Sequence, residues 1–192
     1  VKPVAIASIF SQGNLQNTEN PLDVAIIGSG FFKIEVPGYD EPLYTKAGAF
    51  KIDAEGNLVT SDGYKVVGTE AINEGGYDVS INDDGTVYYM MPNQTDPQEG
   101  GKIEIAKFMN PAGLNKLGNN LFQATANSGE PVDWDSESDA SISLATGYLE
   151  MANVQIVEEM VNLITAQRAY DINSKVIQSS DEMLQTATSL RR

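Results

Sequence analysis

The chain has 192 residues, 41% of them hydrophobic, and a formal net charge of −15, which suits one sizeable domain or one domain with an appendage. It contains neither cysteine nor histidine, so disulfides, zinc–thiolate sites and the usual nucleophilic triads are excluded. The acidic balance disfavours nucleic acid and anionic membrane surfaces as partners. We therefore expect no nucleic-acid binding. No apolar run approaches transmembrane length, so we also expect no direct membrane insertion.

Most of the chain indicates short strands separated by turns. Residues 1–20 pass from an apolar stretch into a polar one, which is typical of an extended connector. From there to residue 148, β-type residues alternate with glycine-containing turn sequences, as in an antiparallel β domain. The turn sequences lie at 28–30, 55–57, 62–63 and 83–85.

Three later segments complete the expected body. Residues 102–108 alternate between polar and apolar types and predict one strand. Residues 128–141 are acidic and polar, so we expect an exposed loop around Trp134. A last strand at 142–148 is expected to lead into the C-terminal segment.

The last 45 residues, 148–192, contain no glycine and no proline, the residues that most often interrupt regular structure. We expect a helix from about Asn153 to Leu190, roughly 57 Å long at about 1.5 Å per residue, with Asn153 as its N-cap. The expected fold is therefore mainly β, with an irregular antiparallel β domain at 21–148 and one long C-terminal α-helix within 149–192.

The apolar side chains of this helix do not form one continuous stripe. One row follows 4-3 spacing from Ile156 onward, a second occupies the first half, and a third, with Ile172 and Val176, occupies the second half. A helix packed only on its own β domain would show a single stripe, so we expect contacts with other chains. The expected subunit-interface residues are Ile156, Val157, Met160, Val161, Leu163, Ile164, Gln167, Tyr170, Ile177, Met183 and Leu184.

The sequence offers no strong candidate for a catalytic, cofactor or metal site. The glycine-rich turn at 28–30 precedes a strand rather than a helix, which excludes a dinucleotide fingerprint there. The densest acidic clusters are Asp83 with Asp84 and the group at 133–139, and both are typical of solvated turns. The second cluster lacks the glycine and the terminal glutamate of an EF-hand. We expect no catalytic residue, no cofactor and no metal; a carboxylate-based hydrolase acting on the cell wall is the enzymatic alternative.

Four long segments resemble the bacterial flagellar rod and hook proteins. They are NPLDVAIIGSGFF at 20–32, LYTKAGAFKIDAEGNLVTSDGY at 43–64, FMNPAGLNKLGNNLF at 108–122 and the whole helix with its approach at 148–190. Within that family the chain resembles the distal rod members most, because it has no room for the extra outer domain of the hook proteins. A proximal rod or hook subunit is the alternative within the family.

The resemblance implies a structural, non-enzymatic function. Such proteins leave the cell unfolded through the flagellar type III export apparatus and polymerise into the helical drive shaft that transmits torque from motor to hook. The implied partners are copies of the chain itself, neighbouring rod and hook proteins and the export apparatus. The implied location is the flagellar basal body outside the cytoplasmic membrane, periplasmic where the cell has an outer membrane.

The resemblance also assigns layers to the predicted parts. In the family, N- and C-terminal helices pair as an inner coiled-coil layer, and the β domain forms an outer layer. It implies that the connector at 1–20 leads from an N-terminal region, with a helix, that lies outside this sequence. Polar positions along the helix, Gln167 among them, are expected to fix the register of the packed helices.

Overall fold

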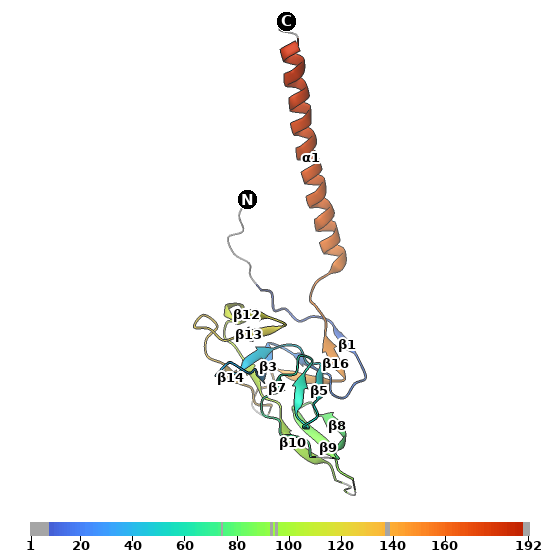
Figure 1. The fold of residues 1–192 in the computed structure, drawn as a ribbon, viewed down its shortest axis with the longest axis vertical. Helices are drawn as coiled ribbons and strands as arrows, with labels where there is room; N and C mark the ends of the chain where they lie inside the picture. The colour runs from blue at the N-terminus through green and yellow to red at the C-terminus, as the bar shows by residue number, and fades with distance from the viewer. Residues whose placement is uncertain (1–7, 74, 93, 95, 137–138, 190–192) are drawn as a thin grey trace. The chain divides into compact units, whose positions relative to one another are not determined.

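The computed structural model describes residues 8–73, 75–92, 94, 96–136 and 139–189. The chain divides into two compact units, Val1–Asn153 and Val154–Arg192 (Figure 1). The first unit, called the body below, holds the strands, and the second holds one long helix. The outer ends of the predicted connector and helix, 1–7 and 190–192, lie outside the described residues.

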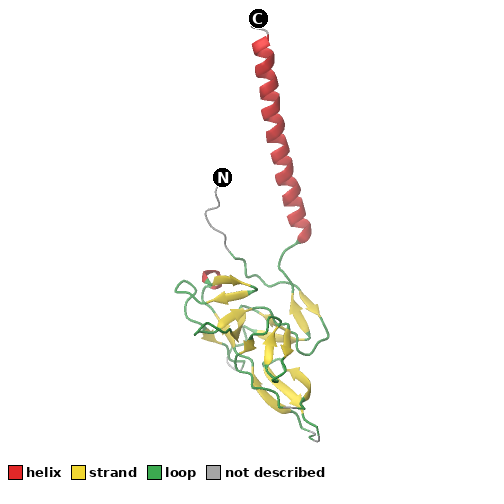
Figure 2. Ribbon diagram, in the orientation of Figure 1, coloured by secondary structure: helices red, strands yellow, loops and turns green. Residues whose placement is uncertain are grey.

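The prediction of a mainly antiparallel β fold with one C-terminal helix is confirmed (Figure 2). Within the described residues the largest sheet has nine strands, and its strand pairs are antiparallel. Its main path is β12 (Asn115–Gly118), β13 (Leu121–Gln123), β4 (Leu43–Thr45), β3 (Gly30–Glu35), β7 (Lys65–Val66), β6 (Leu58–Thr60) and β5 (Phe50–Ile52). Off this path, β11 (Ile105–Lys107) pairs with both β3 and β14 (Val132–Asp133).

Three smaller sheets complete the body. One contains β8 (Tyr77–Ile81), β9 (Thr86–Met90) and β10 (Gln98–Lys102), and another pairs β2 (Val24–Ile27) with β15 (Ser143–Thr146). In the third, β1 (Leu15–Asn17) pairs with β16 (Tyr148–Glu150). Gly147, at φ +76°, separates β15 from β16 and donates its N–H to the carbonyl of Asp23 at 2.7 Å. A positive φ of this kind favours glycine, so the predicted last strand is two strands with a glycine turn between them.

The predicted turns between strands are confirmed where glycine takes positive φ. Gly56 (φ +83°), Gly63 (φ +87°) and Gly85 (φ +87°) lie in the connections β5–β6, β6–β7 and β8–β9, each joining antiparallel strands. The prediction of one strand at 102–108 is wrong, because β10 ends at Lys102 and β11 begins at Ile105. The intervening backbone turns to other partners, with the N–H of Ile103 donating to Gly85.

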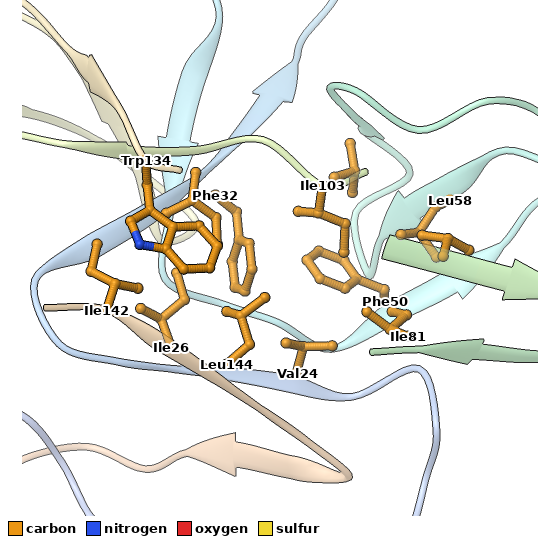
Figure 3. Packing of buried hydrophobic residues seen from close by; sticks show 13 residues of the cluster. Val24, Ile26, Phe32, Phe50, Leu58, Ile81, Ile103, Trp134, Ile142 and Leu144 are labelled. Atoms are coloured by element: carbon orange, nitrogen blue, oxygen red, sulfur yellow. The ribbon is translucent and has the colours of Figure 1, made fainter. Parts of the chain in front are cut away.

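The main core joins the central sheet to the smaller sheets (Figure 3). Phe32 and Phe50 meet edge to face, with ring centroids 5.0 Å apart. The buried members of this cluster are Val24, Ile26, Phe32, Phe50, Leu58, Val66, Ile81, Val87, Ile103, Ile105, Trp134, Ile142 and Leu144. A second cluster gathers four buried side chains around Phe31, with Phe10 from the connector packed against it.

The expectation of an exposed loop around Trp134 is wrong for the tryptophan itself. Its side chain is only 9% exposed and packs in the main core beside Ile142 (Figure 3). The reason is that β14 pairs with β11, and the N–H of Trp134 donates to the carbonyl of Ile105 at 2.8 Å. The indole N–H donates to the carbonyl of Asp139 at 2.9 Å, which satisfies the polar end of a buried ring. Glu137 of the acidic cluster lies outside the described residues.

The helix α1 (Ile156–Ser189) has 34 residues, about 51 Å at about 1.5 Å per residue. Asn153 is not its N-cap: the first intrahelical bond runs from the N–H of Glu159 to the carbonyl of Gln155, and the Asn153 amide donates to the carbonyls of Ile9 and Ser11. Two glutamates occupy the first turn, where they favour the helix dipole. Within the described part of the chain, no helix has both the length and the apolar character needed to cross a membrane.

Candidate subunit interface

The eleven residues predicted to form a subunit interface all lie on α1 and are exposed. Its ten predicted apolar side chains range from 47% exposed at Ile164 to 76% at Tyr170, and Gln167 is exposed too. Among its described residues α1 buries none. A soluble surface rarely shows so many large apolar side chains on one element, so α1 carries apolar area that the single chain leaves uncovered.

The helical period separates these side chains into more than one face. Ile156, Met160, Leu163, Gln167 and Tyr170 follow 4-3-4-3 spacing and form one row along α1. Val157, Val161 and Ile164 widen this row on one side, and Ile177 and Leu184 continue it while drifting by about 20° per heptad.

Met183 belongs to a different face of α1. It lies 27 positions after Ile156, about 7.5 turns at about 3.6 residues per turn, which puts it on the opposite side. Ile172 and Val176, 60% and 57% exposed, share its face to within about 40°. These two were not among the predicted interface residues, although their spacing from Met183 was the signal that could have included them. Ile172 lies 11 positions after Val161 and therefore within about 20° of it around the helix. The apolar surface thus passes from the Ile156 side of α1 in its first half toward the opposite side in its second.

Several hydroxyl groups on α1 donate hydrogen bonds to the helix backbone. Thr165, Ser180, Thr186 and Thr188 each donate their hydroxyl hydrogen to the carbonyl four residues earlier, at 2.8 Å. A hydroxyl bonded in this way can be buried without leaving an unsatisfied donor. These four positions therefore do not oppose close packing of a second helix.

A poorly exposed ion pair anchors β16, the strand that precedes the helical unit. Lys46 Nζ lies 3.3 Å from Glu150 Oε2 in β16, and the two side chains are 17% and 11% exposed. The other carboxylate oxygen of Glu150 accepts the N–H of Gly13 at 2.9 Å. Breaking such a pair leaves a poorly solvated charge, so this contact holds β16, β4 and the connector together.

The acidic segment after β11 is held by lysines. Lys33, in the central strand β3, bonds to Glu104 at 2.9 Å and pairs with Asp133. Burial alone would lower the pKa of Lys33, but the hydrogen bonds that its Nζ donates to Asp133 and Glu104 outweigh burial and raise that pKa above 10.5. These carboxylates serve as partners of a poorly exposed lysine.

Asp139 forms an ion pair with another lysine, Lys107. Its carboxylate accepts hydrogen bonds from Lys107 Nζ at 2.7 Å and from the N–H of Ser141 at 2.9 Å. The hydrogen bonds from Lys107 and Ser141 hold the pKa of Asp139 well below its usual range. A hydrolytic carboxylic acid needs a raised pKa, and among the described residues no cluster of three or more acidic, histidine or cysteine side chains could hold a metal. The arrangement is that of structural ion pairs.

Comparison with known proteins covers both units. The family model for the C-terminal region of flagellar basal body rod FlgEFG proteins matches residues 145–190, and the model for the D1 domain of flagellar hook protein FlgE/F/G matches residues 25–89. Flagellar basal-body rod protein FlgG of Borreliella burgdorferi is 46% identical over 193 residues, which cover 100% of this chain and 72% of the relative. The FlgG proteins of Agrobacterium fabrum and Bacillus subtilis are 46% and 40% identical, covering 95% and 97% of this chain and 70% and 72% of the relatives.

Proposed function

Because the chain belongs to the family of flagellar basal-body rod and hook proteins, we propose that copies of it polymerise through α1 into the shaft that carries torque from motor to hook. The chain is a structural subunit of the distal rod of the flagellum. Its neighbours are other rod and hook proteins of the basal body. A shaft transmits torque through stiff contacts repeated in every subunit, and these contacts must come from surfaces that the single chain leaves exposed.

The observation that carries self-assembly is the exposed apolar surface of α1. Its ten predicted interface side chains are at least 47% exposed, and burying a large aliphatic side chain completely is worth about 1.5–3 kcal/mol. Covering these side chains in a polymer would therefore contribute a large favourable free energy of association. The apolar surface changes side along α1 and therefore needs neighbours on more than one side, which a helical polymer supplies and a simple pair does not.

The remaining assignments are part of the same proposal. We assign α1 to an inner layer of packed helices and residues 21–148 to an outer layer, with 1–20 as the connector between them. The chain acts without catalysis, as the pairing of Asp133 and Asp139 with lysines favours. It reaches the rod by export through the type III apparatus and stands outside the cytoplasmic membrane, in the periplasm where an outer membrane exists.

Electron microscopy of basal bodies from cells that lack the gene tests the proposal. We expect rods that stop short and carry no hook, and full rods after the gene for the unaltered chain is restored. Full-length rods with hooks in the deletion strain would overturn the proposal. A rod of normal length with a missing or shortened hook would move the chain to the hook.

A further inference from the structure

One end of the body is acidic, and the opposite end holds a hollow with one lysine that is uncompensated within the described residues. Residues 66–101, which include β8, β9 and most of β10, contain no lysine and no arginine. The acidic residues of this stretch are Glu70, Glu74, Asp78, Asp83, Asp84, Asp96 and Glu99. Figure 1 shows β8, β9 and β10 at one end of the body and β12, β13 and β16 toward the opposite end. We call the end formed by β8–β10 the acidic end.

The opposite end contains a hollow of about 350 Å³. Its walls include Phe10 and Phe122, whose ring centroids are 5.4 Å apart. Ile9 and Met151 also line the hollow and are 78% and 50% exposed. The two rings and the exposed aliphatic side chains beside them offer apolar area to an aromatic side chain of a partner.

The charge in the hollow is positive although the body is acidic. Two lysines line it, Lys46 and Lys116. Lys46 is compensated by Glu150, which also lines the hollow. Lys116, on the exposed strand β12, makes no ion pair within the described parts of the chain. One lysine is therefore left to attract an acidic side chain from outside.

The acidic end presents an aromatic residue beside an acid, the combination that this hollow fits. Tyr77 is 53% exposed, and Asp78, also exposed, follows it in β8. Asp78 has φ +54° at a register irregularity between Tyr77 and Ser80. Asp96 and Glu99 are exposed near the same end, so more than one carboxylate is available there to Lys116.

We propose that the acidic end of one copy docks into the hollow of the next, with Tyr77 packed against the paired rings of Phe10 and Phe122 and Asp78 facing Lys116. The two surfaces differ and lie at opposite ends of the body, so the contact is head to tail. A head-to-tail contact that does not close into a ring adds copies to an open helical array. The proposal rests on the proposed function, because it supplies an outer-layer contact to a polymer that α1 builds from within.

Cross-linking in rods tests the contact. The chain has no cysteine of its own, so every cross-link comes from introduced residues. A chain with both Asp78→Cys and Lys116→Cys is placed in cells, basal bodies are isolated and a short bis-maleimide is added. We expect a ladder of dimers, trimers and longer species. The matched control combines Asp78→Cys with Lys51→Cys, since Lys51 is exposed on β5 and does not line the hollow.

The outcomes separate the contact from the proposed function. A ladder with Lys116→Cys and none with Lys51→Cys supports the contact. Normal rods that give no ladder, or the same ladder with both pairs, overturn it and leave the rod function standing. Absence of the unaltered chain from purified rods overturns both.

Charge reversal provides a second test that needs no cysteine. Lys116→Glu and Asp78→Lys each place like charges together, so each variant should weaken polymer growth by about two- to fivefold, the range of one partly exposed ion pair. The chain with both changes restores the attraction and should recover most of the loss. Single variants that assemble normally, or a double variant no better than the singles, would contradict the contact.

Discussion

Replacing Leu163 with aspartate should keep the chain out of the rod while leaving the body folded. Leu163 is 59% exposed on α1, and each buried member of the core clusters belongs to the body. In the packed polymer the remaining burial of this leucine is worth about 1–2 kcal/mol, the exposed share of about 1.5–3 kcal/mol for the whole side chain. Burying an unpaired carboxylate in its place costs several kcal/mol more.

The combined loss at Leu163 is about 4 kcal/mol or more for each subunit, which lowers the association constant about a thousandfold. Basal bodies from cells expressing Leu163→Asp should therefore lack the distal shaft. The far-UV circular dichroism and the melting temperature of the body should match those of the unaltered chain. Both readouts are needed, because a misfolded chain would also be missing from the rod.

Asn162→Asp is the matched control for this substitution. It adds the same charge one position earlier, about 100° around the helix, among the polar side chains of the first half of α1. We expect normal rods from Asn162→Asp. Normal rods from Leu163→Asp, or equal loss from both variants, would refute the assignment of the Leu163 row to the packed interior of the rod.

Three further predictions concern the body and are tested by unfolding the purified chain. Phe32→Ala should destabilise the body by about 3–5 kcal/mol, because Phe32 is fully buried against Phe50; a loss below about 1 kcal/mol would contradict its central place. Gly48→Ala should also destabilise, since the added methyl group would overlap the carbonyl oxygen of Val24, and unchanged denaturant midpoints would count against that close approach. The carboxyl of Asp139 has a lowered pKa, so its stabilising contribution is complete above its unfolded pKa of about 3.8 and declines as the pH falls toward its folded value. Asp139→Asn should thus be less stable than the unaltered chain at pH 6, with the difference shrinking below pH 4; a difference independent of pH would contradict the ion pair.

The features that were predictable from the sequence are those set by neighbouring residues. Gly56, Gly63 and Gly85 lie between β-type residues, and each takes the positive φ that a tight connection needs. The helix was equally visible, because its whole length lacks glycine and proline. These signals do not depend on what the segment packs against.

The features that escaped prediction depend on residues far along the chain. Trp134 is surrounded by acidic residues in sequence, yet β14 pairs with β11 and carries the indole into the core. Lys33 lies in the middle of a buried strand because Glu104 and Asp133, 71 and 100 positions later, supply its counter-charges. No local pattern contains such pairings.

The N-cap was mispredicted for a similar reason. Asn153 is a good capping residue by type, but its amide bonds to the connector at Ile9 and Ser11 instead. The eleven interface positions on α1 stay a prediction, since their partners belong to other chains. Their exposure in the single chain is the condition that the prediction requires.

Immunogold electron microscopy of intact hook–basal bodies tests the central claim most directly. The antibody is raised against residues 21–148, and its specificity is checked on basal bodies from cells that lack the gene. We expect gold along the straight shaft directly below the hook. Gold on the curved hook, gold confined to the shaft next to the cytoplasmic membrane, or no gold on intact and partly dissociated basal bodies would contradict the assignment to the distal rod.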